Sequence, residues 1–224
     1  MTPSQLTGKA SDHLEEVLVG EKAFLVHPNA THALLTLREA ALEAGFDLCV
    51  ASGFRDYDRQ KAIWNRKMSG EAAVLDSHSR PLDAQSLTIA ERIHAIMRWS
   101  AVPGASRHHW GTDFDVYAHN LLPRHTSLKL EPWEYHTGHQ HPFYLWLSQT
   151  LQDYGFFFPY HTDRGGVAPE PWHISHRATA DACLTHLTPA LLTEQWHDPD
   201  LLGKEYLISN VDTLYTQFIT NISA

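Results

Sequence analysis

The chain has 224 residues with 17 basic and 26 acidic side chains, which gives a formal net charge of −9. Hydrophobic residues make up 43% and charged residues 19%, as in a globular protein with a sizeable core, so intrinsic disorder is excluded. No basic cluster accompanies the acidic balance, which argues against a nucleic-acid partner because the phosphate backbone selects for Lys and Arg. We expect a single domain over residues 1–224.

The cysteines and the N-terminal segment indicate in which cellular compartment the protein is expected. Cys49 and Cys183 form no Cys-x-x-Cys pair and stand among apolar neighbours, so we expect buried free thiols. No apolar run reaches the roughly 18 residues that a membrane span requires. The N-terminal segment has neither a charged n-region nor an apolar h-region. These features favour a cytoplasmic protein.

The first half of the chain predicts helices around one short strand. Residues 29–44 form a leucine-striped helix with Asn29 as its N-cap, and residues 46–51 form a strand that ends at Ser-Gly. Residues 56–68 are expected to be helical. Residues 88–100 form another helix, which opens with a capping box of Thr88 and Glu91.

The second half alternates short strands with loops and ends in helices. The pattern predicts strands over 112–117, 156–158 and 172–175, loops over 119–141 and 161–169, and helices over 142–154 and most of 178–224. The strands do not alternate strictly with helices. We therefore predict an α+β protein with a small antiparallel sheet flanked by helices.

The chain has 17 histidines, most of them scattered, and one group of them precedes an acidic strand. His108 and His109 come before a glycine and then Asp113 and Asp115, which share one face of the predicted strand. Histidine nitrogens and carboxylate oxygens suit zinc. A histidine-rich turn beside a solvated acidic edge is the other interpretation.

Glu170 and His173 lie close together in a segment with two prolines. The prolines restrict the backbone, which would hold the glutamate in one place as a general base beside a metal site. An ordinary proline-rich turn with a half-buried Trp172 would give the same pattern.

Arg55 follows the Ser52-Gly53 break, and Gln60 lies one turn into the next helix. A guanidinium at such a junction binds carboxylates bidentately. Pairing of Arg55 with Asp56 or Asp58 on the surface is the simpler alternative.

Taken together, the three segments resemble the VanY-type zinc D,D-/L,D-carboxypeptidases. They stand as Ser52-Gly-Phe-Arg55, then Ser106-Arg-His108-His-Trp-Gly-Thr-Asp113-Phe-Asp115, then Glu170-Pro-Trp-His173. The resemblance covers about residues 45–177 and leaves 178–224 as a helical C-terminal extension. It implies the fold shared with the hedgehog signalling domain, with zinc on the sheet.

The resemblance also implies site roles. His108, Asp115 and His173 would bind one zinc ion, Glu170 would be the catalytic base, and Arg55 would bind and polarise the substrate. Asp113 replaces the family's usual alanine, so the resemblance leaves open whether it acts as a ligand, a partner of a ligand or a substrate contact. The remaining implied substrate-binding residues are Ser52, Gln60, Ser106 and Trp172.

The implied reaction is removal of a C-terminal D-amino acid from peptidoglycan stem peptides. In the cytoplasm, recycling of muropeptides requires removal of D-Ala from tetrapeptides, which favours an L,D-carboxypeptidase. A D,D-carboxypeptidase, a D-Ala-D-Ala dipeptidase and an endopeptidase remain alternatives. A hedgehog-like domain that binds zinc without catalysis is a fourth, although the retained Glu170 argues against it.

Overall fold

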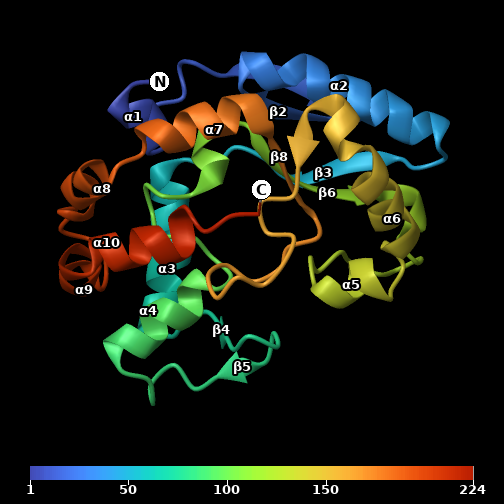
Figure 1. Cartoon of the computed structure of the whole chain (residues 1–224). Coiled ribbons are helices and arrows are strands. Elements are labelled where there is room, and N and C mark those ends of the chain that lie inside the picture. Colours follow the sequence, from blue (N-terminus) through green and yellow to red (C-terminus); the bar gives the residue numbers. More distant parts are fainter. Residues whose placement is uncertain (224) are drawn as a thin grey trace.

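A computed structural model describes residues 1–223 and is built around a four-stranded antiparallel sheet (Figure 1). The strand order is β3 (Leu48–Ser52), β6 (Asp113–Ala118), β8 (His173–His176) and β7 (Phe156–Phe157). The predicted α+β class with a small antiparallel sheet is confirmed.

The two central strands pair in a register that decides what each face of the sheet presents. Asp113 lies opposite Ser175, and Asp115 lies opposite His173. Between them, Phe114 pairs with Ile174, and both side chains point into the core. One face of the sheet is therefore apolar, and the other bears the polar residues of the predicted site.

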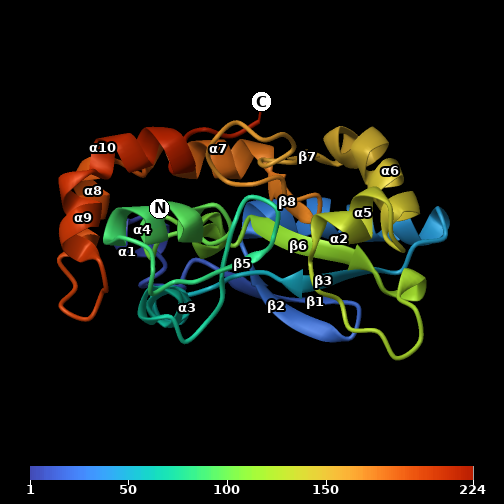
Figure 2. The same ribbon diagram turned by 90° about the horizontal axis from the view of Figure 1, so that it is seen from below.

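Helices surround the sheet on several sides (Figures 1 and 2). In both views α5 (Pro132–His136) and α6 (His141–Thr150) lie at one side of the sheet, and the C-terminal helices α8 (Pro189–Trp196), α9 (Lys204–Ser209) and α10 (Val211–Leu214) lie at the other. The helical segments are α1 Pro3–Leu6, α2 Pro28–Glu43, α3 Tyr57–Ser69, α4 Ile89–Met97, η1 Arg107–Trp110, η2 His119–Leu121, α5 Pro132–His136, α6 His141–Thr150, η3 Leu151–Tyr154, α7 Arg177–His186, α8 Pro189–Trp196, α9 Lys204–Ser209, α10 Val211–Leu214 and η4 Tyr215–Ile219.

Two hydrophobic clusters form the interior. The first packs the apolar face of the sheet, with Phe114 and Val116, against α2 and α6. The second joins α3 and α4 to α7–α10 and includes the fully buried Trp64 and Trp196. The segment that runs from η1 into β6 contributes Trp110 to the second cluster and Phe114 to the first, so it links the two.

Several sequence expectations need correction. The predicted loop 119–141 contains the short helix α5, and helix α2 begins at Pro28 with His27, not Asn29, as its N-cap. Two hairpins were not predicted: β1 (Glu15–Val19) with β2 (Lys22–Val26), and β4 (Val74–Leu75) with β5 (Pro81–Leu82). Their strands are short or mixed in polarity, so residue pattern alone does not distinguish them from loops.

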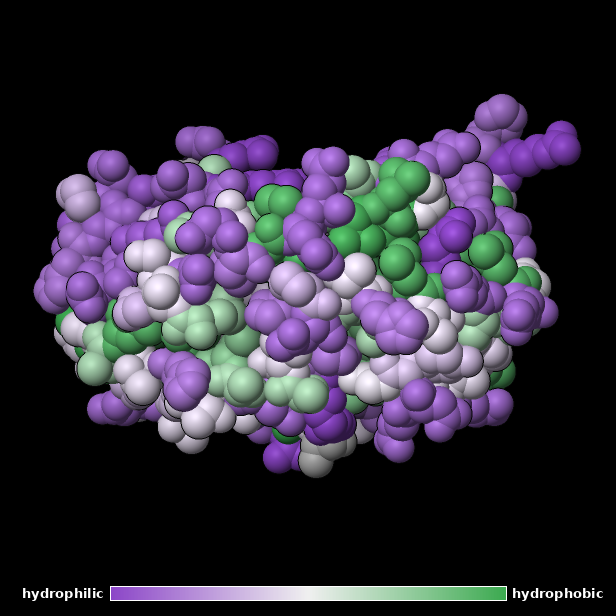
Figure 3. Space-filling view, turned by 90° about the horizontal axis from the view of Figure 1, so that it is seen from above, coloured by the Kyte–Doolittle hydropathy of each residue, from purple (hydrophilic) through white to green (hydrophobic). Residues whose placement is uncertain are grey.

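The outer surface is mainly polar. In Figure 3, hydrophilic residues cover much of the face seen from above, and hydrophobic residues form separated areas among them. Within residues 1–223, no helix combines the length and the apolar character needed to cross a membrane.

Gly111 provides a test of how the site segment is fixed. It ends η1 at φ +68°, and an added Cβ would lie 2.7 Å from Leu14 Cδ2 and 3.0 Å from the backbone nitrogen of His27. Gly45 has a similar φ of +89° but no neighbour within 4 Å. Gly45→Ala should therefore lower the free energy of unfolding by about 1–2 kcal/mol, and Gly111→Ala by about 1–3 kcal/mol more. Urea denaturation measures both, and equal losses would contradict the packing argument.

Candidate active site

Three potential metal ligands converge on the polar face of the sheet. His108 from η1, Asp115 from β6 and His173 from β8 each offer a ligand atom, and these atoms lie within 4.8 Å of one another. Asp115 Oδ2 is 3.6 Å from His108 Nε2, and Asp115 Oδ1 is 3.5 Å from His173 Nδ1. All three side chains are buried.

The chemistry of these donors fits zinc. Asp115 Oδ1 is buried without a hydrogen-bond partner, which is costly unless a cation or another donor satisfies it. Two histidine nitrogens and one carboxylate oxygen leave a position open in a four-coordinate site, as in catalytic zinc centres. His108, Asp115 and His173 are thus the residues that would hold the ion.

The neighbouring histidines His108 and His109 have different surroundings. His108 Nδ1 lies 3.0 Å from the Gly53 carbonyl oxygen, so its Nε2 faces the other two ligands. His109 Nδ1 lies 2.6 Å from the Arg55 carbonyl oxygen, and its Nε2 accepts a hydrogen bond from the Gly104 N–H. Burial lowers the pKa of His109 to about 4, so this imidazole is a neutral structural group with both nitrogens occupied.

Asp113 lies behind His173 and not in the cavity. Its Oδ1 is 2.9 Å from His173 Nε2, and Arg107 Nε donates to the same oxygen at 2.7 Å. Thr112 Oγ1 donates to Oδ2, and Arg107 also donates to the Ser175 hydroxyl. Because Asp113 is fully buried, its carboxylate is not available to substrate. Its contact with Nε2 instead orients the His173 ring so that Nδ1 faces Asp115.

The charges around His173 set its protonation. Burial by itself would lower the pKa of His173, but hydrogen bonds with Asp113 and Glu170 and the charge of Asp115 raise it to about 10. Burial opposes ionisation of Asp113 as well, yet Arg107 and His173 lower the pKa of that carboxyl. Zinc binding at His173 Nδ1 would have to displace a proton.

Glu170 lies next to the ligand set. Its Oε2 is 3.1 Å from His173 Nδ1, and its backbone N–H donates to the Tyr160 carbonyl oxygen. The ring of Tyr160 meets the ring of His173 edge to face at a centroid distance of 5.0 Å. Glu170 lines the same cavity as the three ligands, which is the position that a general base requires.

The side chain of Arg55 lines the cavity and is held there by hydrogen bonds to two uncharged side chains. Its guanidinium donates to Gln60 Oε1 at 2.8 Å and to the Ser52 hydroxyl at 3.0 Å. Gln60 is fully buried and also donates to the Ala101 carbonyl oxygen. Ser52 and Gln60, which the sequence placed at the substrate, therefore orient Arg55, whereas Ser106 and Trp172 do line the cavity.

The cavity has a volume of about 280 Å³ and includes residues from outside the three motifs. No motif in the sequence indicated that Lys67, Tyr160, the 129–131 segment, or Phe218 and Ile219 of η4 line it. The last two come from the C-terminal extension, whose Gln217 and Asn221 also hydrogen-bond the backbone of the loop before Glu170. Chain segments that are far apart in sequence thus form the wall of the cavity together.

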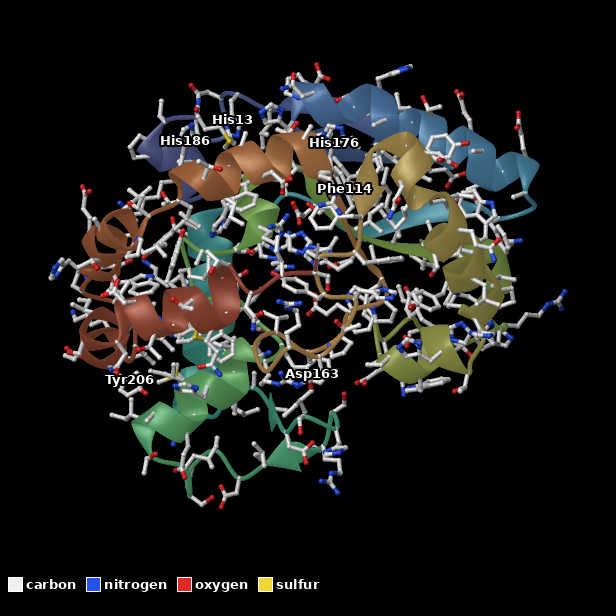
Figure 4. The ribbon with its side chains drawn as sticks, viewed as in Figure 1. His13, Phe114, Asp163, His176, His186 and Tyr206 are labelled. Atoms are coloured by element: carbon white, nitrogen blue, oxygen red, sulfur yellow. The ribbon has the colours of Figure 1, made fainter. Side chains whose placement is uncertain are left out.

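The other histidines lie elsewhere. Figure 4 shows His176 and His186, at the two ends of α7, and His13 near one edge of the molecule. Together with His27, the first two line a separate surface pocket. Within residues 1–223, only His108, Asp115 and His173 bring three donor atoms close enough for one ion.

The position of Asp113 predicts its effect on metal affinity. Asp113→Ala should weaken zinc binding by about 10- to 100-fold, because His173 would lose the acceptor that orients its ring. Chelator competition measures the affinity without reference to activity. Asp153→Ala, at an acidic residue that does not line the cavity, should leave it unchanged. Unaltered affinity in Asp113→Ala would refute this role.

Comparison with known proteins agrees with this geometry. Residues 23–179 match the family model described as VanY, D-alanyl-D-alanine carboxypeptidase. An uncharacterized protein of Haemophilus influenzae is 37% identical over 122 residues, which cover 53% of this chain and 92% of the relative.

Two solved structures share the fold. VanYB in complex with D-alanine-D-alanine has a TM-score of 0.53 and 25% identity, and the match covers 87% of both chains. A mutant of the D,D-pentapeptidase VanY in complex with Zn(II) has the same TM-score at 23% identity, with coverage of 88% and 92%. The family match spans well over half of the sequence. The chain belongs to the VanY D-alanyl-D-alanine carboxypeptidase family.

Proposed function

We propose that this protein removes the C-terminal D-Ala from tetrapeptide stem peptides, as an L,D-carboxypeptidase. The observation that supports this specificity is a charged wall of the cavity formed by Lys129, Leu130 and Glu131. In a tetrapeptide, the residue before the scissile bond has a long side chain that ends in an amine, as in lysine or diaminopimelate. A wall with both charges suits such a side chain better than the methyl group of D-Ala.

The wall is held in place by a buried acid. The fully buried Glu134 accepts hydrogen bonds from the backbone N–H groups of Lys129 and Glu131. Leu130, between them, has a φ of +56°, a conformation that is costly for a branched residue. Such strain persists only where surrounding contacts impose it, and it is concentrated at ligand-binding segments.

The side chains around the cavity have complementary tasks in peptide hydrolysis. When bound, zinc supplies Lewis-acid activation of the water and of the scissile carbonyl. Glu170 accepts a proton from the attacking water and returns it to the amine of the departing D-Ala. Arg55 stabilises the negative charge that develops on the carbonyl oxygen. Together these steps release one free D-amino acid and one shortened peptide.

The D,D-carboxypeptidase activity is the second candidate, because the related VanYB binds D-alanine-D-alanine. In a pentapeptide, the residue before the scissile bond is D-Ala, which leaves the charged wall to contact a residue farther from the scissile bond.

An L,D-specific enzyme would act on tetrapeptides released during turnover of the cell wall, so we also propose muropeptide recycling in the cytoplasm as its setting.

A competition experiment tests the specificity. Zinc-loaded protein given equal amounts of tetrapeptide and pentapeptide should consume the tetrapeptide faster, as followed by mass spectrometry. Glu131→Gln should reduce this preference, because the wall would lose its negative charge, whereas Glu16→Gln on exposed β1 serves as a matched control. Conversion of pentapeptide to a tetrapeptide that is then left intact would favour the D,D activity instead.

A further inference from the structure

Two half-buried cations, Arg55 and Lys67, line the cavity without a carboxylate partner; a third, Lys129, is exposed. Among the described residues 1–223, neither Arg55 nor Lys67 has a carboxylate oxygen within 4.0 Å of its nitrogen atoms. The nearby carboxylates, Asp115 and Glu170, belong to the zinc site and the base. Unpaired cations in a partly enclosed cavity are costly unless a ligand brings an opposite charge.

The surroundings of Lys67 point to a ligand. Lys67 is in the last turn of α3, and its ammonium group donates to the Ser100 hydroxyl at 2.6 Å. This is its one hydrogen bond within the described chain, although an ammonium group has three donors. Burial lowers its pKa, an effect that the positive charge of Arg55 reinforces and Glu170 opposes.

A structural role at the helix end does not account for this burial. A cation in the last turn stabilises a helix through its favourable interaction with the helix dipole, and it does so even when it is fully exposed. The adjacent Arg66 occupies such a position, since it is exposed and does not line the cavity. Lys67 instead turns toward Ser100, whose neighbours Trp99, Ala101 and Val102 form an apolar part of the cavity wall.

We propose that Lys67 is a specificity-determining residue that binds the free carboxylate at the C-terminus of the substrate. The proposal rests on the proposed function, because every carboxypeptidase substrate has this anion one residue beyond the scissile bond. Arg55, fixed by Gln60 and Ser52, then acts at the carbonyl oxygen, and Lys67 acts at the terminus. An internal peptide bond has no such anion, so Lys67 selects for removal of a terminal residue over internal cleavage.

The test compares one stem peptide that ends in D-alanine with the same peptide ending in D-alaninamide. Lys67→Met should lower kcat/KM for the free acid by about 10- to 100-fold, mainly through KM, because a charge-assisted hydrogen bond is lost. It should leave kcat/KM for the amide unchanged. Lys67→Arg should restore part of the loss, and Arg66→Met should behave as the wild type with both peptides.

Equal losses with both peptides in Lys67→Met, or no loss with the free acid, would overturn the proposal. Failure of the wild type to cleave either peptide would contradict the proposed function instead. In that case, calorimetry with free D-alanine and D-alaninamide tests Lys67 on the zinc-loaded protein. Weaker binding of D-alanine alone in Lys67→Met supports the proposal, and unchanged D-alanine binding refutes it.

Discussion

The register between β6 and β8 is the constraint on which the site depends. It places Asp115 opposite His173 and Asp113 opposite Ser175, with Phe114 and Ile174 turned to the other face. A shift of one residue would direct Phe114 to the site and both aspartates into the hydrophobic core. The apolar face, packed against α2 and α6, therefore fixes the position of the polar face, and the placement of the candidate metal ligands follows from core packing.

Charge balance explains why so many ionisable groups tolerate burial. Asp113 and Arg107 form a fully buried pair with further hydrogen bonds to Thr112 and Ser175, so neither charge is left uncompensated. On the cavity side, Asp115 and Glu170 would oppose the two positive charges of a zinc ion. The substrate carboxylate would complete this balance at Lys67.

The motifs predicted the members of the site because each motif is short and can be identified in the sequence without knowledge of the fold. The resemblance of the three segments to the VanY-type family indicated His108, Asp115, His173, Glu170 and Arg55, and the structure places all five around one cavity. The role of Asp113 could not be predicted, because it depends on Arg107 and on the β6–β8 register. Likewise, Gln60 faces inward from α3 and binds Arg55, a direction that helix periodicity does not reveal.

The fold was predicted best where hydrophobic periodicity is strong, as in the capped helix α4 that begins after Thr88. It was predicted least well where pairing between distant segments determines structure, as for the hairpin β1–β2 and the residues Phe218 and Ile219 in the cavity wall. Long-range contacts of this kind leave no local pattern in the sequence.

In the proposed function, metal binding and proton transfer belong to different residues of one site. Zinc content and peptide turnover, measured on the same preparation of Glu170→Ala, test this most directly. We expect one zinc per chain in this variant and a loss of turnover on the order of 10²- to 10⁴-fold. Normal turnover, or loss of the zinc together with activity, would contradict it.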